Sequence, residues 1–285
     1  MELPFELDLN NKVAVVTGGA GVLCGTFAEA LAEAGADVAI LDIDLEGAEA
    51  QVEKIKENGG SAAAFETNIL EKESLEESRK AVNEMFGTCD ILINGAGGNH
   101  PSGTTTKDYL EIEDLAGTDE DITTFFDLDA KGIQFVFNLN FLGALLTSQV
   151  FAKDMAEKEE STIINVSSMN AFTPLTRIPA YSGAKAAVSN FTQWLAVHLS
   201  KVNVRVNALA PGFFETAQNK ALLRNEDGGY SDRAKKILGQ TPMDRFGKPE
   251  ELLGTLFWLV SDKASGFVNG TVIPIDGGFS AYSGV

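Results

Sequence analysis

The sequence predicts a single α/β domain spanning residues 1–285, in which about seven parallel strands form one doubly wound sheet with helices on both faces. Short apolar stretches rich in β-branched residues alternate with helical patterns along the chain. The first of these stretches leads through a glycine-rich turn into a helical pattern. No linker or low-complexity tract divides the chain, which favours one domain over two.

The expected strands are short apolar runs that end in glycine or polar residues. They occupy residues 12–19, 37–44, 61–68, 89–97, 161–168, 203–212 and 270–278. The expected helices are the stretches in which apolar residues recur every three or four positions. They occupy residues 27–36, 47–60, 71–87, 141–157, 184–200 and 250–261.

Two segments interrupt this alternation. Residues 101–132 form an insertion rich in Thr, Asp and Glu, and residues 213–240 form a second polar segment. Both begin soon after the carboxyl end of an expected strand, where open α/β sheets bind their ligands. We therefore expect both to cover a ligand site, the second as a substrate lid. Its candidate contacts are Gln218, Asn219, Lys220 and Arg224, with a solvated helix face as the alternative for Lys220 and Arg224.

The charge balance argues against nucleic acid and membrane partners. The chain carries 41 acidic and 22 basic residues, a formal net charge of -19 at pH 7, which repels a phosphate backbone or an anionic membrane. An anionic substrate therefore needs local cations to capture it. The two cysteines, Cys24 and Cys89, are too few for a disulfide framework, so we expect free thiols in a reducing compartment.

The amino-terminal residues 1–12 are acidic and lack the basic and apolar pattern of a signal peptide. No run of about 18 apolar residues follows, so we expect a cytoplasmic protein without a membrane partner. His100 and Cys24 have no further ligands at metal-binding spacing around them. We therefore expect no required metal.

A glycine-rich turn at residues 17–25 joins the first expected strand to the first helix. Such glycines let the backbone approach a pyrophosphate at the helix N-terminus. Asp42 ends the second strand, where its carboxylate can accept hydrogen bonds from an adenosine ribose, with a turn or cap role as the alternative. Residues 38–52 contain four acidic residues and no Lys or Arg to offset a 2'-phosphate, so NAD is favoured over NADP.

Tyr181 and Lys185 stand four residues apart at the beginning of an amphipathic helical pattern, so their side chains share one face. The apolar positions of this helix recur at steps of three and four, and the pair falls at the edge of that stripe. A phenol and an ammonium are therefore directed partly inward. On this stretch alone, a packed tyrosine beside a lysine that reaches solvent is the alternative.

These residues resemble the short-chain dehydrogenase/reductase family over essentially the whole chain, which implies a Rossmann-type fold. The matching positions are the glycine turn at residues 17–25, NGAG at residues 94–97, Asn140, Ser168, Tyr181, Lys185, Pro211 and Gly212. Ser168 lies thirteen positions before Tyr181, the usual interval in the family, and is chosen over Ser167 for that reason. Val22 and Cys24 stand where the family usually has glycine.

Further stretches are similar to the short-chain branch of D-mannonate oxidoreductases, also called fructuronate reductases. They are TGGAGVLCG, GAGGNHP, FDLD, VFNLNFLG, SSMNAF and IDGGFSAYSGV. The similarity implies NAD-dependent interconversion of D-fructuronate and D-mannonate. The family implies a homotetramer, with the helices around Asn140 and Tyr181 at one interface and the carboxyl terminus near another. The alternatives are a reductase of another sugar acid or polyol, such as a keto-gluconate, and a non-enzymatic NAD-binding regulatory protein.

The resemblance assigns a role to each matching residue. Tyr181 is the general acid in reduction and the base in oxidation, its pKa lowered from about 10 by Lys185 and an oxidised nicotinamide. Lys185 also holds the nicotinamide ribose, and Ser168 hydrogen-bonds the reacting carbonyl oxygen. Asn140 supports a water-mediated proton path or, alternatively, satisfies backbone groups inside its helix. The expected cofactor contacts are Gly18, Gly19, Gly21, Val22, Leu23, Asp42, Asn68, Ile69, Asn94, Gly95, Ala96, Gly97, Tyr181, Lys185, Pro211 and Gly212.

A sugar acid carries a carboxylate and several hydroxyls, so its pocket needs cations and amides. Asn99 and His100 follow a strand end, Asn170 follows the catalytic serine, and Arg177 comes four residues before Tyr181. We expect these four residues to bind the substrate. Asn99 and His100 have stabilisation of a turn as their alternative, and Arg177 has a surface ion pair.

Overall fold

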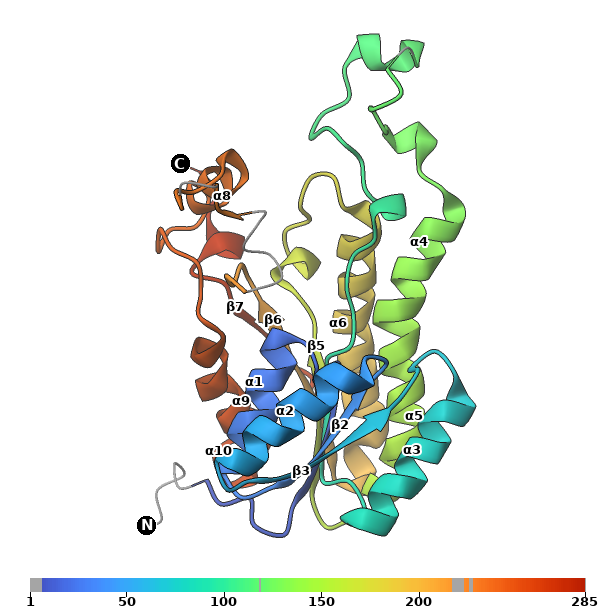
Figure 1. The fold of residues 1–285 in the computed structure, drawn as a ribbon, viewed down its shortest axis with the longest axis vertical. Coiled ribbons are helices and arrows are strands. Elements are labelled where there is room, and N and C mark those ends of the chain that lie inside the picture. Colours follow the sequence, from blue (N-terminus) through green and yellow to red (C-terminus); the bar gives the residue numbers. More distant parts are fainter. Residues whose placement is uncertain (1–6, 118, 217–222, 226–227, 285) are drawn as a thin grey trace.

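The computed structural model describes residues 7–117, 119–216, 223–225 and 228–284. Within them, seven parallel strands form one sheet in the order β3-β2-β1-β4-β5-β6-β7 (Figure 1). The strands are β1 Val13–Thr17, β2 Asp37–Asp42, β3 Ser61–Glu66, β4 Ile91–Asn94, β5 Ser161–Val166, β6 Val204–Pro211 and β7 Val272–Ile275. The seven expected strands and the doubly wound α/β fold are confirmed.

Helices lie on both faces of the sheet, as parallel strands require. They are α1 Val22–Glu33, α2 Leu45–Glu57, α3 Lys72–Met85, α4 Ala130–Phe137, α5 Gly143–Met155, α6 Pro179–Leu199, α8 Asp232–Leu238, α9 Leu253–Val260 and α10 Asp262–Ser265. On one face, α1, α2 and α9 form a core around Phe27 and Leu256. On the other, α3, α5 and α6 form a second core around Leu75, Phe151 and Phe191.

The carboxyl edge of the sheet gathers the residues expected to carry function. β1 pairs with β2 on one side and with β4 on the other, so the strand order reverses between β1 and β4. Ligands of open α/β sheets bind at this switch point. Thr17 and Asn94, which end β1 and β4, lie directly opposite each other there. Asp42 ends β2 at the same edge, and Ser168 follows β5.

The helix expected at residues 141–157 begins earlier, at Ala130, inside the segment expected to be a polar insertion. A π-turn, η4 Asn138–Leu142, joins α4 to α5. Gly132 and the two asparagines of the π-turn interrupt the apolar period of the sequence, and these residues hid the first turns of the helix.

The continuous helix Ala130–Met155 is 26 residues long and by length and composition is apolar enough to cross a membrane. Half of its most apolar stretch is buried in the protein. Val150, Phe151 and Met155 belong to the core of the sheet's second face. A core helix of a soluble protein meets the same criterion, so this helix is weak evidence for a membrane span.

Residues 104–117 and 119–129 form an arm that projects from the body of the molecule beyond α4 (Figure 1). Two short 3-10 turns, η2 Ile112–Ala116 and η3 Phe125–Asp127, lie within it. Besides its polar residues, the arm carries exposed apolar side chains. Tyr109, Ile112, Phe125 and Phe126 expose 68–79% of their surface, because the arm is too thin to bury them.

The segment of residues 213–240 contains α8, whose Ala234 and Leu238 pack with Leu223 and Phe246 in a small separate cluster. Arg224 forms an ion pair with Glu215 at 2.7 Å, so its guanidinium is already occupied. Gln218, Asn219 and Lys220, which the sequence suggested as further substrate contacts, lie outside the described residues.

Candidate active site

The glycine turn after β1 brings backbone close to backbone. Gly18 has φ +72°, and a Cβ there would lie 2.8 Å from the backbone nitrogen and Cα of Ala96. A Cβ at Gly19 would lie 2.7 Å from Cγ2 of Ile40. Gly21 caps α1 without a side chain, so the amides of the first turn face outward to a ligand. This bare cradle, which Val22 and Leu23 continue as the first residues of α1, fits a pyrophosphate.

Cys24 is compatible with the turn because Gly95 lacks a side chain. The Cys24 sulfur occupies the space that a Cβ at Gly95 would need. Burial raises the pKa of the Cys24 thiol to about 12, so the sulfur is an inert packing group. The absence of a side chain at Gly95 therefore makes room for a cysteine where the family usually has glycine, and the turn stays tight.

Asp42 holds two turns at the end of β2. Its Oδ2 accepts a hydrogen bond from the amide of Ala20 at 3.0 Å, and its Oδ1 accepts one from the amide of Asp44 at 3.0 Å. The turn role that the sequence left open is thus present. An ionised carboxylate offers about four acceptor positions, so two remain for a ribose diol.

Thr17 holds the turn after β4, a role that was not predicted from the sequence. Its Oγ1 accepts hydrogen bonds from the amides of Gly95 at 3.0 Å and Ala96 at 3.2 Å. The Asn94 side chain points into the sheet and donates to Asn165 Oδ1 at 2.8 Å, so its amide does not contribute to the ligand edge. The position of this threonine directly before the glycines of the turn is the sequence feature from which its role could have been predicted.

Four further expected cofactor residues shape the edge through backbone and packing. The Asn68 side chain accepts from the Leu70 amide at 3.1 Å, and Ile69 is buried in the second core. Pro211 ends β6, and a Cβ on the following Gly212 would lie 2.6 Å from Cα of Asp276.

Ser168, Tyr181 and Lys185 come together at the carboxyl edge. Ser168 follows β5 and is hydrogen-bonded to the phenol of Tyr181. Lys185, one turn further along α6, donates to the carbonyl oxygen of Val166 at 2.8 Å. Its Nζ lies 5.6 Å from the centroid of the Tyr181 ring. The helix face predicted from the sequence therefore delivers a phenol and an amine to one place.

The pKa of Tyr181 is raised in the protein without cofactor. Burial raises the pKa of the phenol, and the hydrogen bond with Ser168 offsets this only in part. Burial also lowers the pKa of Lys185 to about 8. In the protein alone, desolvation sets the direction of this pKa; the expected lowering depends on a bound oxidised nicotinamide as well as Lys185 and stays a prediction for the complex with NAD. At neutral pH Tyr181 is a protonated phenol, the form that donates a proton.

Asn140 lies in the π-turn and is buried. Its Oδ1 accepts from the Gly98 amide at 3.1 Å, and its Nδ2 donates to the carbonyls of Gly98 at 2.7 Å and Val136 at 2.8 Å. A Cβ at Gly97 would lie 2.5 Å from Asn140 Oδ1 and 3.3 Å from Lys185 Nζ. Asn140 thus satisfies backbone groups, as one alternative held, and also borders the catalytic amine.

Asn99 and His100 stabilise a turn. His100 Nδ1 accepts a hydrogen bond from the Ser102 amide at 3.2 Å, and its ring packs edge-on against Phe135 with centroids 5.1 Å apart. Asn99 Nδ2 donates to Thr104 Oγ1 at 2.9 Å. Both side chains are exposed, and the structure shows the turn role that was their alternative.

Asn170 lies beside Ser168, and Arg177 lies in the turn before α6. The backbone amide of Asn170 donates to Ser168 Oγ at 3.2 Å. The buried side-chain Oδ1 of Asn170 has no hydrogen-bond partner among the described residues. Arg177 donates from Nε to the Thr105 carbonyl at 3.0 Å. Its backbone adopts φ +73°, a left-handed conformation that a non-glycine residue rarely takes and that is typical of functional turns.

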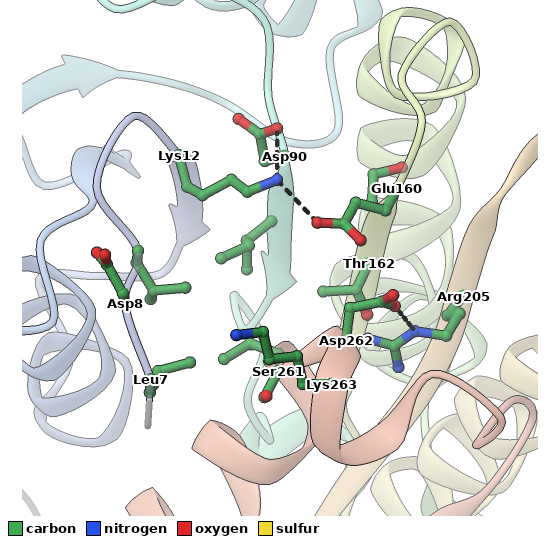
Figure 2. A pocket seen from close by; sticks show the side chains of 14 residues that line it. Leu7, Asp8, Lys12, Asp90, Glu160, Thr162, Arg205, Ser261, Asp262 and Lys263 are labelled. Carbon is green, nitrogen blue, oxygen red and sulfur yellow. Dashed lines mark hydrogen bonds and ion pairs between the residues drawn. The ribbon is translucent and has the colours of Figure 1, made fainter. Parts of the chain in front are cut away.

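The opposite, amino edge of the sheet holds a cavity of about 280 Å³ (Figure 2). Its charges are already paired: Lys12 Nζ lies 3.3 Å from Glu160, and Arg205 Nε lies 3.1 Å from Asp262. Neither Lys12 nor Arg205 is therefore free to bind an anion in this cavity. No group of three or more His, Cys, Asp or Glu side chains could hold a metal ion in the described part of the chain.

The family model of the short chain dehydrogenases matches residues 12–227. The chain belongs to the short-chain dehydrogenase family. As a short-chain dehydrogenase it is an oxidoreductase, and the expectation of an enzyme rather than a non-enzymatic NAD-binding protein is confirmed.

Known proteins are similar to this short-chain dehydrogenase along nearly its whole length. An uncharacterised oxidoreductase of Haemophilus influenzae is 56% identical over 285 residues, 100% of this chain and 99% of the relative. A crystal structure from the same species, with bound NAD and the provisional name D-mannonate oxidoreductase, superimposes with a TM-score of 0.94 at 56% identity and full coverage of both chains. The 5-keto-D-gluconate 5-reductase of Escherichia coli is 32% identical over 272 residues, 95% of this chain and 96% of the relative.

Proposed function

We propose that this enzyme interconverts D-fructuronate and D-mannonate with NAD as the hydride carrier. The observation that carries the proposal is the partly buried Tyr181 phenol, hydrogen-bonded to Ser168 beside Lys185 at the carboxyl edge of the sheet. The relative with the provisional name D-mannonate oxidoreductase shares 56% of its sequence and crystallised with NAD, which supports the choice of substrate and cofactor.

The nucleotide fits the residues present. The cradle at Gly18 and Gly21 leaves room for a pyrophosphate, and the Asp42 carboxylate stands where an adenosine ribose is held. A 2'-phosphate would meet this carboxylate without a compensating cation between residues 38 and 52, which favours NAD over NADP. When bound, the reduced nicotinamide supplies a hydride to the carbonyl carbon.

The chain supplies the proton and the charge stabilisation. In reduction, Tyr181 donates its phenolic proton to the carbonyl oxygen, and Ser168 hydrogen-bonds the same oxygen as negative charge builds on it. Lys185, a cation below about pH 8, stabilises the phenolate that Tyr181 becomes. Asn140 keeps Gly98 in place and, as the family resemblance suggests, supports a water-mediated path that returns the proton to Lys185.

The substrate carboxylate and hydroxyls need partners near Ser168. Asn170 offers a buried amide oxygen without a partner among the described residues, which suits a sugar hydroxyl. Arg177 offers a guanidinium fixed through its Nε, which suits the carboxylate. Asn99 and His100 contribute to the site through the turn they stabilise.

Reduction of 5-keto-D-gluconate is the second candidate, because the Escherichia coli relative of that name shares 32% of its sequence with this chain. It uses the same catalytic residues. A purified-enzyme assay of NADH oxidation with D-fructuronate, D-tagaturonate and 5-keto-D-gluconate separates the two. We expect D-fructuronate to give a kcat/KM about tenfold or more above the other ketones. A higher value for 5-keto-D-gluconate would transfer the assignment to it.

We also propose that the enzyme is a homotetramer in the cytoplasm. The outer face of α6 exposes Trp194 by 57% and Val197 by 76%, and His198 stacks on Trp194 with ring centroids 4.8 Å apart. Contiguous exposed apolar surface of this kind is typical of protein interfaces. The two cysteines are buried free thiols, in keeping with a reducing compartment.

A further inference from the structure

The carboxylate of Asp108 joins three segments that are far apart in the sequence. Its Oδ1 accepts a hydrogen bond from Thr176 Oγ1 at 3.0 Å, and its Oδ2 forms an ion pair with Lys236 Nζ. Asp108 lies at the base of the arm, Thr176 lies in the turn before α6, and Lys236 lies in α8. The arm follows strand β4, the turn before α6 follows β5, and α8 follows β6, so all three segments come after the carboxyl end of a strand.

A second link lies beside the first. The Arg177 carbonyl accepts from the Thr105 amide at 2.8 Å, and Arg177 Nε donates back to the Thr105 carbonyl at 3.0 Å. Residues 105–108 and 176–177 are therefore tied by three hydrogen bonds. The left-handed conformation of Arg177 needs such support, because it is strained on its own.

The position of these links relates them to catalysis. Tyr181 stands four residues after Arg177, on the first turn of α6. α8 belongs to the segment that leaves the end of β6, where substrate-covering segments are expected. Asp108 exposes only 23% of its side chain, whereas Lys236 exposes 69%. The carboxylate is thus the fixed centre of the junction, and the lysine reaches it from solvent.

We infer that Asp108 is a positioning residue for the substrate: it holds α8 and the base of the arm against the 176–177 turn and so fixes the side of the site that receives the ketone. Asp108 touches neither the nucleotide cradle nor the Tyr181 phenol among the contacts described. Its loss is therefore expected to affect substrate affinity more than the chemical step or NAD binding. This inference rests on the proposed oxidoreductase site, whichever sugar acid that site reduces.

A charge-swap series tests the inference. The variants are Asp108→Asn, Asp108→Lys, the swap Asp108→Lys with Lys236→Asp, and the mismatched swap Asp108→Lys with Lys235→Asp. The two double variants have the same net charge, and Lys235 pairs with Asp232 rather than with Asp108, so the mismatched swap is the matched control. KM, kcat and the NADH dissociation constant are measured with whichever ketone of the panel the wild type reduces best.

We expect Asp108→Asn and Asp108→Lys to raise KM for the ketone by about threefold to tenfold, with kcat and NADH affinity changed less than twofold. The swap should recover most of the lost affinity, and the mismatched swap should not. Wild-type KM in both single variants, or equal KM in the two double variants, would overturn the inference.

Hydrogen exchange provides a readout that does not depend on turnover. The Thr105 amide and the amides of α8 should exchange faster in Asp108→Lys and return toward the wild-type rate in the swap. Unchanged exchange in Asp108→Lys would contradict the positioning role. If the wild type reduces no ketone of the panel, the proposed substrate fails while this exchange comparison still decides the role of Asp108.

Discussion

At the scale of single residues, proton transfer depends on the Tyr181 phenol. Tyr181→Phe keeps the ring that packs beside Lys185 and removes only the proton donor. We expect kcat for ketone reduction to fall about 10²- to 10⁴-fold, with NADH binding measured by fluorescence unchanged. Tyr109→Phe, at a side chain exposed by 79% on the arm, is the control and should leave kcat unchanged. Normal turnover in Tyr181→Phe would refute the proton role.

Lys185 gives the reaction a predictable pH dependence. Burial lowers its pKa to about 8, so its cation is present below that pH and is lost as the pH rises through it. Ketone reduction needs the cation to stabilise the forming phenolate of Tyr181. We therefore expect kcat/KM for the ketone, at saturating NADH, to be level near neutral pH and to fall above about pH 8. A profile that stays level to about pH 10 would show that Lys185 does not titrate in this way.

The site residues that could be predicted from the sequence are those whose spacing along the chain determines their positions relative to one another. Tyr181 and Lys185 share a helix face at four residues' separation, and this geometry survives folding because it is local. The direction of the Tyr181 pKa could not be predicted, since burial is set by elements distant in the sequence. The link between Arg177 and Thr105 was equally hidden, because it joins residues 72 positions apart.

At the scale of elements, the loop after β4 must pass closely between α6 and the π-turn. A methyl group at Gly97 would press on Asn140 Oδ1 and Lys185 Nζ. We expect Gly97→Ala to lower kcat/KM by about tenfold or more, because both side chains have to move. Gly98→Ala is the matched control, since a Cβ there meets nothing within 4 Å. Equal kinetics in the two variants would show that the close approach at Gly97 is not needed.

Strands could be predicted more reliably than the segments between them. The central strands are runs of apolar residues buried on both faces, as in β1, whose five residues are all buried. The start of α4 at Ala130 could not be predicted because Gly132 and the two asparagines of the π-turn interrupt the apolar period. The arm was predicted as an insertion but not as a projecting element, because its exposed Phe125 and Phe126 look like core residues in the sequence.

At the scale of the whole molecule, NAD should stabilise the folded chain. A ligand that binds only the native state adds about 2.7 kcal/mol at one hundred times its dissociation constant. We expect NAD to raise the Tm in thermal unfolding and NADP at the same concentration to raise it less, because Asp42 repels a 2'-phosphate. Asp42→Ser should narrow the difference between the two cofactors. A larger rise with NADP in the wild type would contradict the assigned cofactor preference.

The exposed apolar residues of α6 also predict how copies of the chain assemble into an oligomer. Val197 lies on the outer face of α6 and exposes 76% of its surface, so Val197→Asp leaves the core intact and places a charge on an apolar stripe. If this stripe joins subunits, the variant should have a smaller mass in light scattering than the wild type, approaching the 30.4 kDa of one chain or twice that value. Met85→Asp, an equivalent change at a residue 59% exposed on α3, should retain the wild-type mass. A Val197→Asp variant with the wild-type mass would place any subunit interface elsewhere, and the projecting arm with its exposed aromatic residues would then be the next surface to alter.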